Sequence, residues 1–299
     1  MYLYRKLISS IAFGLLILPF NGVAAEQGNE VVGQKCPIRS FEEVRAQYKP
    51  APIKAGTPLI DREVFWARMN KIALAKEIFW FKSKKTDKHT GSVSYVDKEV
   101  IFHRSIINNE HRAVINAIFD RWEATGGGHP KHLALMLGTA YRETCGFFSS
   151  TVGEACGCKK LCNKEEFKGA SYGKKDECGR AYFGRGFVQL TKRKNYETVG
   201  EKLHIPLSEH PNLAYEQPFA IIMLVDGVKG RWYAGQPLNT YLNDNVSDWV
   251  LAQESVNPNS PNKAATGYLA CRFYDAIQPA YKKRAPVQDP ALCMTLKNP

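Results

Sequence analysis

Residues 109–143 read NEHRAVINAIFDRWEATGGGHPKHLALMLGTAYRE, and this stretch decides the fold class. Apolar residues recur three and four positions apart on both sides of Gly126-Gly127-Gly128, which predicts two helices separated by a glycine break. Asn109 is the predicted cap of the first helix, and His129-Pro130 opens the second. The apolar stripe of the second helix ends at Glu143. A carboxylate is therefore expected on the apolar face at a helix end, where desolvation raises its pKa.

Helical patterns continue on both sides of this pair. One predicted helix is capped by Asp61 and carries the apolar residues Phe65, Met69, Ile72 and Phe79. Further helices are expected over about 191–203, 218–228, 247–255 and 262–277. Residues 92–103 are rich in β-branched and aromatic side chains, which predicts a short strand or hairpin. Because strand signal is sparse elsewhere, we expect a mainly α fold.

The first 25 residues have the pattern of an export signal. Arg5 and Lys6 precede the apolar run Leu7–Phe20, and the small residues Gly22–Ala25 offer a cleavage site. The run is shorter than the roughly 20 apolar residues that a membrane span needs, so we expect no stable membrane insertion. The sequence predicts an exported monomer, located in the periplasm or outside the cell.

Composition limits the possible partners. The 299 residues contain 44% hydrophobic and 11% aromatic side chains, which excludes a disordered chain. The formal net charge of +12 falls to +10 once Arg5 and Lys6 leave with the signal, and such a charge suits anionic surfaces. The densest basic and aromatic segment, 79–88, carries no nucleic-acid-binding motif. We expect a solvated loop there, flanked by core aromatics, and no nucleic-acid partner.

Eight cysteines follow the signal: Cys36, Cys145, Cys156, Cys158, Cys162, Cys178, Cys271 and Cys293. An even number of cysteines in an exported chain favours disulfides, whose connectivity stays open. The cluster from Cys156 to Cys178 has a four-thiolate zinc site as its alternative reading. Its spacing lacks the paired C-x2-C form of zinc modules, so we expect disulfides, no metal and no cofactor.

Two segments together identify a family resemblance. Residues 138–147 read GTAYRETCGF, and residues 181–191 read AYFGRGFVQLT, followed by Asn195-Tyr196. A helix ending in Glu-Thr about 40 residues before Gly-Arg-Gly-x-x-Gln-Leu-Thr resembles glycoside hydrolase family 19, which includes plant-type chitinases and phage-type endolysins. The resemblance covers residues 108–277 and implies a lysozyme-like, two-lobed helical catalytic domain with disulfide-bearing loops.

The signal pattern and the resemblance together divide the chain into four expected parts. They are a signal peptide (1–25), a small mixed extension of unknown role (26–107), a catalytic domain (108–285) and a C-terminal tail (286–299). We expect the extension to dock on the catalytic domain as a helix and a hairpin.

Glycoside hydrolysis uses one carboxyl to protonate the leaving oxygen and a second to handle water or the sugar carbon. Glu143 is the expected acid. By resemblance Glu154, eleven residues further on, is the expected base, with Glu165, Glu166 and Glu177 as alternatives. The loop between Glu143 and Glu154 suggests an open cleft with room for water, so we expect inversion.

The resemblance implies substrate contacts for Tyr182, Arg185, Gln189, Thr191, Asn195 and Asn257. Five of them have a structural alternative. Tyr182 would pack in the core and Arg185 would brace a turn, whereas Gln189, Thr191 and Asn195 would cap the helix after 191. The chain departs from the family pattern at Arg142, at Pro258 and at Lys194, and the last change is expected to alter substrate preference.

The expected function is hydrolysis of β-1,4 bonds in N-acetylglucosamine polymers, with chitin as the first substrate. Peptidoglycan is the alternative that the positive charge favours. A catalytically silent protein that binds chitin or cell walls is a third reading, which the retained carboxylates oppose.

Overall fold

Asn108 caps the helix at the start of the central stretch. Its side-chain oxygen accepts a hydrogen bond of 2.8 Å from the backbone N–H of His111. The predicted cap, Asn109, is wrong by one residue, because Asn109 is the first residue of α3 (Asn109–Ala124). Gly126, Gly127 and Gly128 follow with positive φ, so the predicted glycine break is confirmed.

This computed structural model describes residues 36, 39–50, 56–74, 77–86, 93–102, 108–146, 148–152, 173–233, 235–258, 260, 263–283 and 293, with only the backbone for residues 73, 74, 77–86 and 93–102. The predicted signal lies outside these residues. The described residues all belong to one structural unit that spans 36–299.

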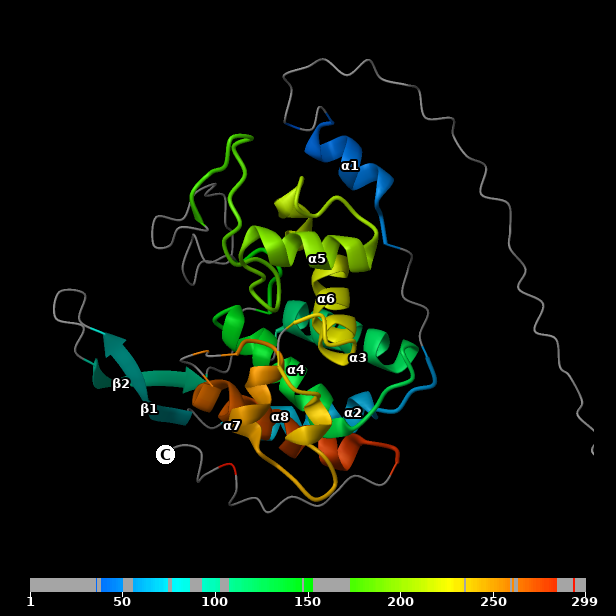
Figure 1. Cartoon of the computed structure of the whole chain (residues 1–299). Coiled ribbons are helices and arrows are strands. Elements are labelled where there is room, and N and C mark those ends of the chain that lie inside the picture. The colour runs from blue at the N-terminus through cyan, green and yellow to red at the C-terminus, as the bar shows by residue number, and fades with distance from the viewer. Residues whose placement is uncertain are drawn as a thin grey trace, which may run out of the picture. The chain divides into compact units, whose positions relative to one another are not determined.

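The second predicted helix, α4 (Pro130–Glu143), forms the centre of the core. Every residue from Leu133 to Tyr141 is buried. The helix packs along α8 (Lys263–Ala280), as Figure 1 shows. A Cβ atom at Gly138 would lie 2.6 Å from the backbone nitrogen of Ala270. Glycine at this position therefore sets how closely the two helices approach.

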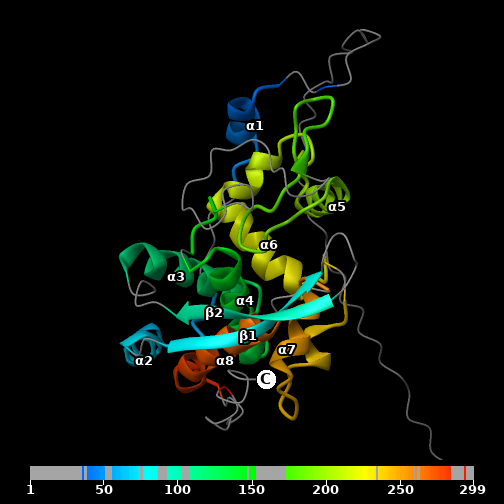
Figure 2. The same cartoon turned by 90° about the vertical axis from the view of Figure 1, so that its left-hand side faces the viewer.

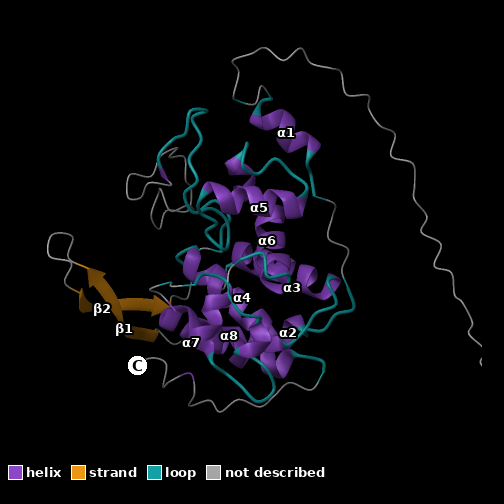
Figure 3. Cartoon of the chain, viewed as in Figure 1, coloured by secondary structure: helices purple, strands orange, loops and turns teal. Residues whose placement is uncertain are grey.

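The other helices complete a mainly α fold, which confirms the predicted class (Figure 3). They are α1 (Phe41–Gln47), α2 (Arg62–Leu74), α5 (Arg193–Leu203), α6 (Gln217–Lys229) and α7 (Trp249–Ala252), with short 3-10 turns at Pro211–Tyr215, Leu238–Thr240 and Gln253–Ser255. Among the helices of the described chain, none is both long and apolar enough to cross a membrane.

Two strands pair beside the helices. β1 (Glu77–Thr86) runs antiparallel to β2 (Val93–Phe102), with Glu77 opposite Phe102 (Figure 2). The strand predicted over 92–103 is confirmed. The helix predicted to reach Phe79 is wrong, because α2 ends at Leu74 and Phe79 lies in β1. The solvated loop predicted for 79–88 is wrong over 79–86, because these residues lie in β1. Residues 87 and 88 lie outside the described residues.

Residues 56–74 attach to α3 through the buried carboxylate of Glu123 and to the end of α8 through a β-bridge. Both Glu123 oxygens are engaged: Oε1 accepts the backbone N–H of Leu59 and of Ile60 at 2.8 and 2.9 Å, and Oε2 lies 2.7 Å from the Arg62 guanidinium. Ile60 also forms a β-bridge with Tyr281, just beyond α8. The helix α2 packs directly on α8. The division of the chain into four parts stays a prediction.

Disulfides account for the described cysteines. Cys36 is bonded to Cys178 and Cys271 to Cys293, and Cys145 is also disulfide-bonded. No cysteine in the described part of the chain is free. The four-thiolate zinc alternative is wrong as stated, because its fourth ligand, Cys178, is bonded to Cys36. The other three cysteines of that cluster lie outside the described residues.

Candidate active site

Glu143 is the last residue of α4, and the turn after it is held by its own backbone. The N–H of Gly146 donates to the Tyr141 carbonyl at 2.7 Å, and the N–H of Cys145 donates to the Arg142 carbonyl at 3.2 Å. Cys145 has φ +53°, so these bonds form a helix-ending motif with a left-handed residue. The half-buried Glu143 side chain therefore projects from a fixed helix end.

A hollow of about 340 Å³ lies beside the Gly-Arg-Gly-x-x-Gln-Leu-Thr segment. Its walls come from three parts of the chain: residues 188–195, the segment after α6, and the segment after the 3-10 turn at Gln253–Ser255. The lining residues are Val188, Gln189, Leu190, Thr191, Lys192, Asn195, Trp232, Tyr233, Val256, Asn257 and Pro258. Four residues predicted to contact substrate thus line one hollow, namely Gln189, Thr191, Asn195 and Asn257.

The turn that carries Gln189 is shaped by backbone contacts. The N–H of Leu190 donates to the Arg185 carbonyl at 3.0 Å, closing a tight turn between the two. Gly186 has φ +71°, and a Cβ there would lie 2.8 Å from the carbonyl oxygen of Ala214. Only glycine fits at that position without displacing the backbone of Ala214.

Hydrogen bonds fix the orientation of two side-chain amides in the hollow. The Gln189 amide nitrogen donates to the carbonyls of Val152 and Gly186, both at 2.9 Å. The Asn195 amide nitrogen donates to the Thr191 carbonyl at 2.8 Å. In the described part of the chain, the amide oxygens of Gln189 and Asn195 and the hydroxyl of Thr191 accept no hydrogen bond. They offer acceptors for the N–H and O–H groups of a sugar.

A buried hydrogen bond joins α4 to the segment that leads to the hollow. Thr139 lies one helical turn before Glu143, so the two share a face of α4. The Thr139 hydroxyl donates to Oε1 of Gln253 at 3.1 Å, and both side chains are fully buried. The Gln253 carbonyl in turn accepts the backbone N–H of Asn257 at 2.9 Å. The face of α4 that carries Glu143 is therefore joined to the Asn257 wall of the hollow.

Arg185 does not line the hollow. It is 3% exposed, and its guanidinium lies 3.7 Å from the ring centre of Phe183. It donates to the Ala181 carbonyl, to the Tyr196 hydroxyl and to the Asn212 side chain at 2.8–3.1 Å. These contacts brace the loop, as the structural alternative for Arg185 predicts.

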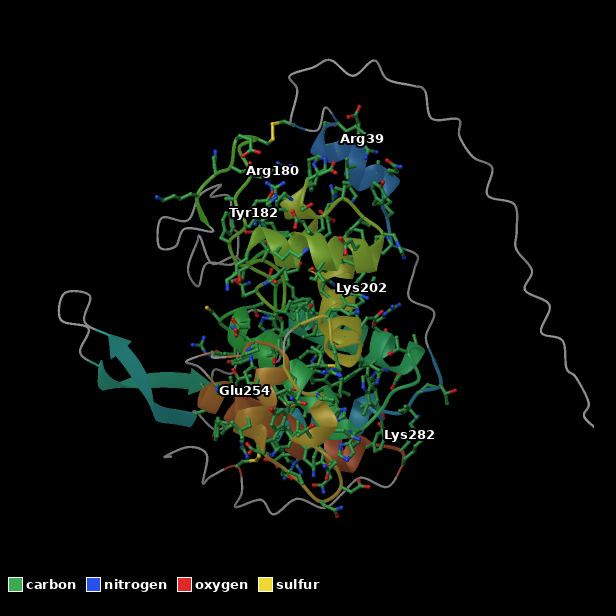
Figure 4. All side chains as sticks on the ribbon, in the orientation of Figure 1. Arg39, Arg180, Tyr182, Lys202, Glu254 and Lys282 are labelled. Carbon is green, nitrogen blue, oxygen red and sulfur yellow. A yellow bond between two sulfur atoms is a disulfide. The ribbon has the colours of Figure 1, made fainter. Side chains whose placement is uncertain are left out.

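Tyr182 also points into the protein. Its hydroxyl lies 3.1 Å from a carboxylate oxygen of Asp176 and 2.9 Å from the Ser208 carbonyl. Figure 4 labels Tyr182 together with Arg180, which lies in the same loop. Burial, together with the nearby Asp176 charge, raises the pKa of Tyr182 to about 12. Tyr182 therefore stays a neutral donor, and its backbone carbonyl accepts the N–H of Lys192 at 2.8 Å. This chain of contacts supports the wall of the hollow at Lys192.

Asp176 holds the loop from Cys178 to Tyr182 in place through hydrogen bonds. Its carboxylate accepts the backbone N–H of Cys178 and of Arg180, each at 2.9 Å, and the Arg180 guanidinium at 2.9 Å. Burial pushes the pKa of Asp176 upwards, but these hydrogen bonds outweigh it and hold the pKa below its ordinary value.

The position of the second carboxylate falls outside the described residues. Glu154, Glu165 and Glu166 all lie in the segment 153–172, which the structure does not describe. The remaining alternative, Glu177, is exposed beside Cys178. The assignment of the base therefore stays a prediction.

The residues of the hollow that sequence reasoning missed include Lys192, Trp232 and Tyr233. The backbone N–H of Trp232 donates to the Gly227 carbonyl at 2.8 Å, and the Tyr233 hydroxyl donates to the Met223 carbonyl at 2.7 Å. Both aromatic residues are thus folded back against α6. The only sequence signal was a pair of aromatic residues directly after a helix.

A comparison with known proteins agrees with the family resemblance that the motifs at 138–147 and 181–191 indicate. Basic endochitinase CHB4 of Brassica napus is 29% identical over 122 residues, which are 38% of this chain and 43% of that relative. The match thus spans less than half of the relative. This similarity to an endochitinase confirms the predicted chitinase-like resemblance. No family model matches the chain.

Two solved structures are also similar. Chitinase C from Streptomyces griseus HUT6037 is 19% identical with a TM-score of 0.36, covering 71% of this chain and 91% of that one. A bacterial family 19 chitinase is 16% identical with a TM-score of 0.32, covering 59% of this chain and 88% of that one.

Proposed function

We propose that this chain is a glycoside hydrolase that cleaves β-1,4 bonds in polymers of N-acetylglucosamine. The observation that carries the proposal is that Gln189, Thr191, Asn195 and Asn257, which come from two distant parts of the sequence, line one polar hollow. The similarity to an endochitinase supports the same reaction class. Chitin is the first proposed substrate.

In this mechanism Glu143 is the general acid. It donates its proton to the glycosidic oxygen as the bond to the anomeric carbon breaks. The half-buried position at the end of α4 supports this role, since it withdraws the carboxyl group partly from solvent. The helix-ending turn at Cys145 and Gly146 holds the backbone of this residue, which limits its motion during proton transfer.

The second carboxylate, Glu154, acts as general base in the proposal. It takes a proton from a water molecule that attacks the anomeric carbon from the opposite face, so the configuration inverts. An inverting enzyme keeps its two carboxyl groups roughly 6.5–9.5 Å apart to seat that water. Thr191 is proposed to hold the water through its hydroxyl, for which the described residues provide no acceptor.

The hollow holds the sugar next to the cleaved bond. The amide oxygens of Gln189 and Asn195 are proposed acceptors for the N-acetyl N–H and a ring hydroxyl. Trp232 adds an aromatic surface to the same hollow, and the apolar face of a pyranose ring packs well on such a surface.

We also propose that the protein works outside the cytoplasm as a monomer. The disulfides Cys36–Cys178 and Cys271–Cys293 support this location, because such bonds persist in oxidising compartments.

Substitution Glu143→Gln tests the proposal. The amide keeps the shape of the side chain but has no proton to donate, so hydrolysis of glycol-chitin should fall by at least 100-fold. The control is Glu201→Gln, an exposed position on α5, which should leave the rate unchanged. Retention of more than a tenth of the activity by Glu143→Gln would remove Glu143 from the role of acid. A zymogram of the unmodified protein on glycol-chitin and on purified peptidoglycan tests hydrolysis against silent binding.

A further inference from the structure

The two polar walls of the hollow belong to different parts of the fold. The 188–195 wall carries Gln189 and Thr191 and continues into α5. The 256–258 wall carries Asn257, and the 3-10 turn directly before it packs on α8. A ligand hydrogen-bonds to both walls only while their separation stays within its reach. Binding across the hollow therefore depends on a feature that fixes this separation.

A disulfide near the start of the described chain leads to the 188–195 wall. Cys36 is bonded to Cys178, whose backbone N–H donates to the carboxylate of Asp176. The same carboxylate accepts the hydroxyl of Tyr182, and the Tyr182 carbonyl accepts the N–H of Lys192. A continuous chain of contacts thus runs from Cys36 to the wall that contains Lys192.

The helix α1 attaches to the same side of the hollow. Val44 is fully buried, and Arg45 lies 3.0 Å from Glu216 at the start of α6. Glu216 directly follows the 3-10 turn that contains Asn212, and the Asn212 side chain accepts the Arg185 guanidinium at 3.1 Å. Because Arg185 braces the Gly-Arg-Gly turn before the 188–195 wall, α1 adjoins the support of that wall. Residues 36–50 therefore form a first anchor on this side.

Residues 56–74 form a second anchor, on the side of the 256–258 wall. A Cβ atom at Gly56 would lie 2.4 Å from the carbonyl oxygen of Glu123, so the chain lies directly on the end of α3. The N–H of Asp61 donates to the Ala280 carbonyl at 2.7 Å. The helix α2 then packs on α8, which also supports the turn before the 256–258 wall.

The two anchors are attached near the two ends of α6. The first contacts Glu216 at its start. The second contacts Glu123 in the last turn of α3, and the same helix holds the other end of α6 through a hydrogen bond of 2.9 Å from Arg121 to Asp226. Figures 1 and 2 both show α1 at the end of the molecule that carries α5, and α2 at the end that carries α8.

A short link joins the anchors along the chain. Only residues 51–55 separate Pro50 from Gly56. A fully extended chain covers roughly 3.3–3.6 Å per residue, so these two residues cannot be more than about 22 Å apart. The link therefore sets an upper limit on the distance between the anchors, in addition to the connection that α6 provides.

We propose that residues 36–74 act as a strap that holds the two walls of the hollow at a fixed separation, and so positions Gln189 and Thr191 relative to Asn257. The inference rests on the proposed function only for the identity of the hollow as a sugar site. Among the described residues that line the hollow, none belongs to the strap. The strap therefore acts through the segments on which its anchors are fixed.

Breaking the link between the anchors tests the inference. In one variant a sequence cut by a single specific protease replaces residues 51–55, and the folded protein is compared before and after the cut. The disulfide to Cys178 keeps the first anchor attached, so the cut removes the link alone. A second variant lengthens the same link with glycine and serine, which makes it flexible without a cut. The control carries Cys271→Ser and Cys293→Ser, which removes a disulfide outside the strap.

Two measurements are made on each protein, in a Glu143→Gln background that prevents turnover. Electron spin resonance gives the distance distribution between labels at the exposed residues Glu201 of α5 and Leu251 of α7, introduced as unnatural amino acids that leave the disulfides intact. Titration calorimetry gives the affinity for the tetramer of N-acetylglucosamine.

The cut and the lengthened link should both broaden the distance distribution and weaken binding by at least about fivefold, the lower end of usual couplings between distant sites. The uncut protein and the control should keep a narrow distribution and full affinity. An unchanged distribution or an unchanged affinity in the cut and lengthened proteins would overturn the inference, and so would an equal change in the control. Failure of the tetramer to bind any of the proteins would contradict the proposed function instead, and the distance distributions would then decide on the strap.

Discussion

Thr139 donates a hydrogen bond of 3.1 Å to Oε1 of Gln253, and both side chains are fully buried. This contact joins α4 to the segment that leads to Asn257, so it links the end of the helix that carries Glu143 to one wall of the hollow.

Substitution Thr139→Val should therefore affect stability and activity together. The change keeps the volume but leaves the buried Oε1 of Gln253 without its donor, which costs about 1–3 kcal/mol of unfolding free energy. The matched control is Thr266→Val, because the equally buried hydroxyl of Thr266 has no hydrogen-bond partner among the described residues. Urea unfolding should show a loss for Thr139→Val and no loss for Thr266→Val; equal losses would contradict the role given to Gln253.

Among the ion-paired carboxylates of the described residues, Glu123 is expected to contribute most to the free energy of unfolding. Glu123→Ala removes the buried partner of the Arg62 guanidinium and the acceptor of two backbone N–H groups, which should lower the unfolding free energy by about 3–5 kcal/mol. Asp120→Ala removes the exposed partner of the same arginine and should cost less than about 1 kcal/mol. Chemical unfolding of both variants checks this; similar losses would show that the burial of Glu123 is unimportant.

The close contact between α4 and α8 predicts that one methyl group added at Gly138 lowers the unfolding free energy strongly. Gly138→Ala places a Cβ atom within 2.6–2.8 Å of the nitrogen, Cα and Cβ of Ala270, so the helices must separate. We expect a loss of more than about 2 kcal/mol, in the range of overpacked cores. The control Gly126→Ala has open space but φ +81°, and strain alone should cost about 1 kcal/mol. A thermal melt in which Gly138→Ala is the more stable variant would contradict the close approach.

His132 predicts how stability depends on pH. Burial is the main cause that lowers the pKa of His132 to about 4, although its ring lies 2.8 Å from the Leu242 carbonyl. The unfolded chain, with an ordinary histidine pKa of about 6.5, then binds more protons than the folded one between these values. Unfolding free energy should fall as pH drops from 6.5 towards 4, by about 3 kcal/mol in total.

The measurement is denaturant unfolding at several pH values between 6.5 and 5, above the range in which most carboxylates titrate. His132→Asn should reduce the slope of unfolding free energy against pH. The exposed residue His204 supplies the control, and His204→Asn should leave the slope unchanged. An identical slope in His132→Asn would mean that the buried ring is not the source of the pH dependence.

The helices that the sequence predicted best are those whose local signals agree. α3 and α4 have an apolar face, a cap and a glycine break within 40 residues, so their bounds follow from the chain itself. The error at Phe79 has a different origin. An apolar run such as 77–81 suits a helix or a strand equally well, and the choice depends on pairing with residues 98–102.

Side-chain direction in the irregular segment 181–192 was harder to predict. A loop has no period that separates inward from outward positions, so Arg185 and Tyr182 had the same predicted role as Gln189 and Thr191. The structure turns Arg185 and Tyr182 towards the interior and places Gln189 and Thr191 at the hollow. Lys192 was missed because nothing in a basic run distinguishes the one lysine that lines the hollow from its neighbours.

The β-bridge between Ile60 and Tyr281 has a consequence for biosynthesis. The chain is made from its N-terminus, and Leu59, Ile60 and α2 find their partners on α8 and on Lys282, close to the C-terminus. The part of this early segment that packs on α8 therefore stays uncovered until α8 has been synthesised, although Phe65 can already pack on Phe119 of α3. A contact between segments so far apart in the sequence is slow to form, so the pairing of Ile60 with Tyr281 is expected to form late in folding.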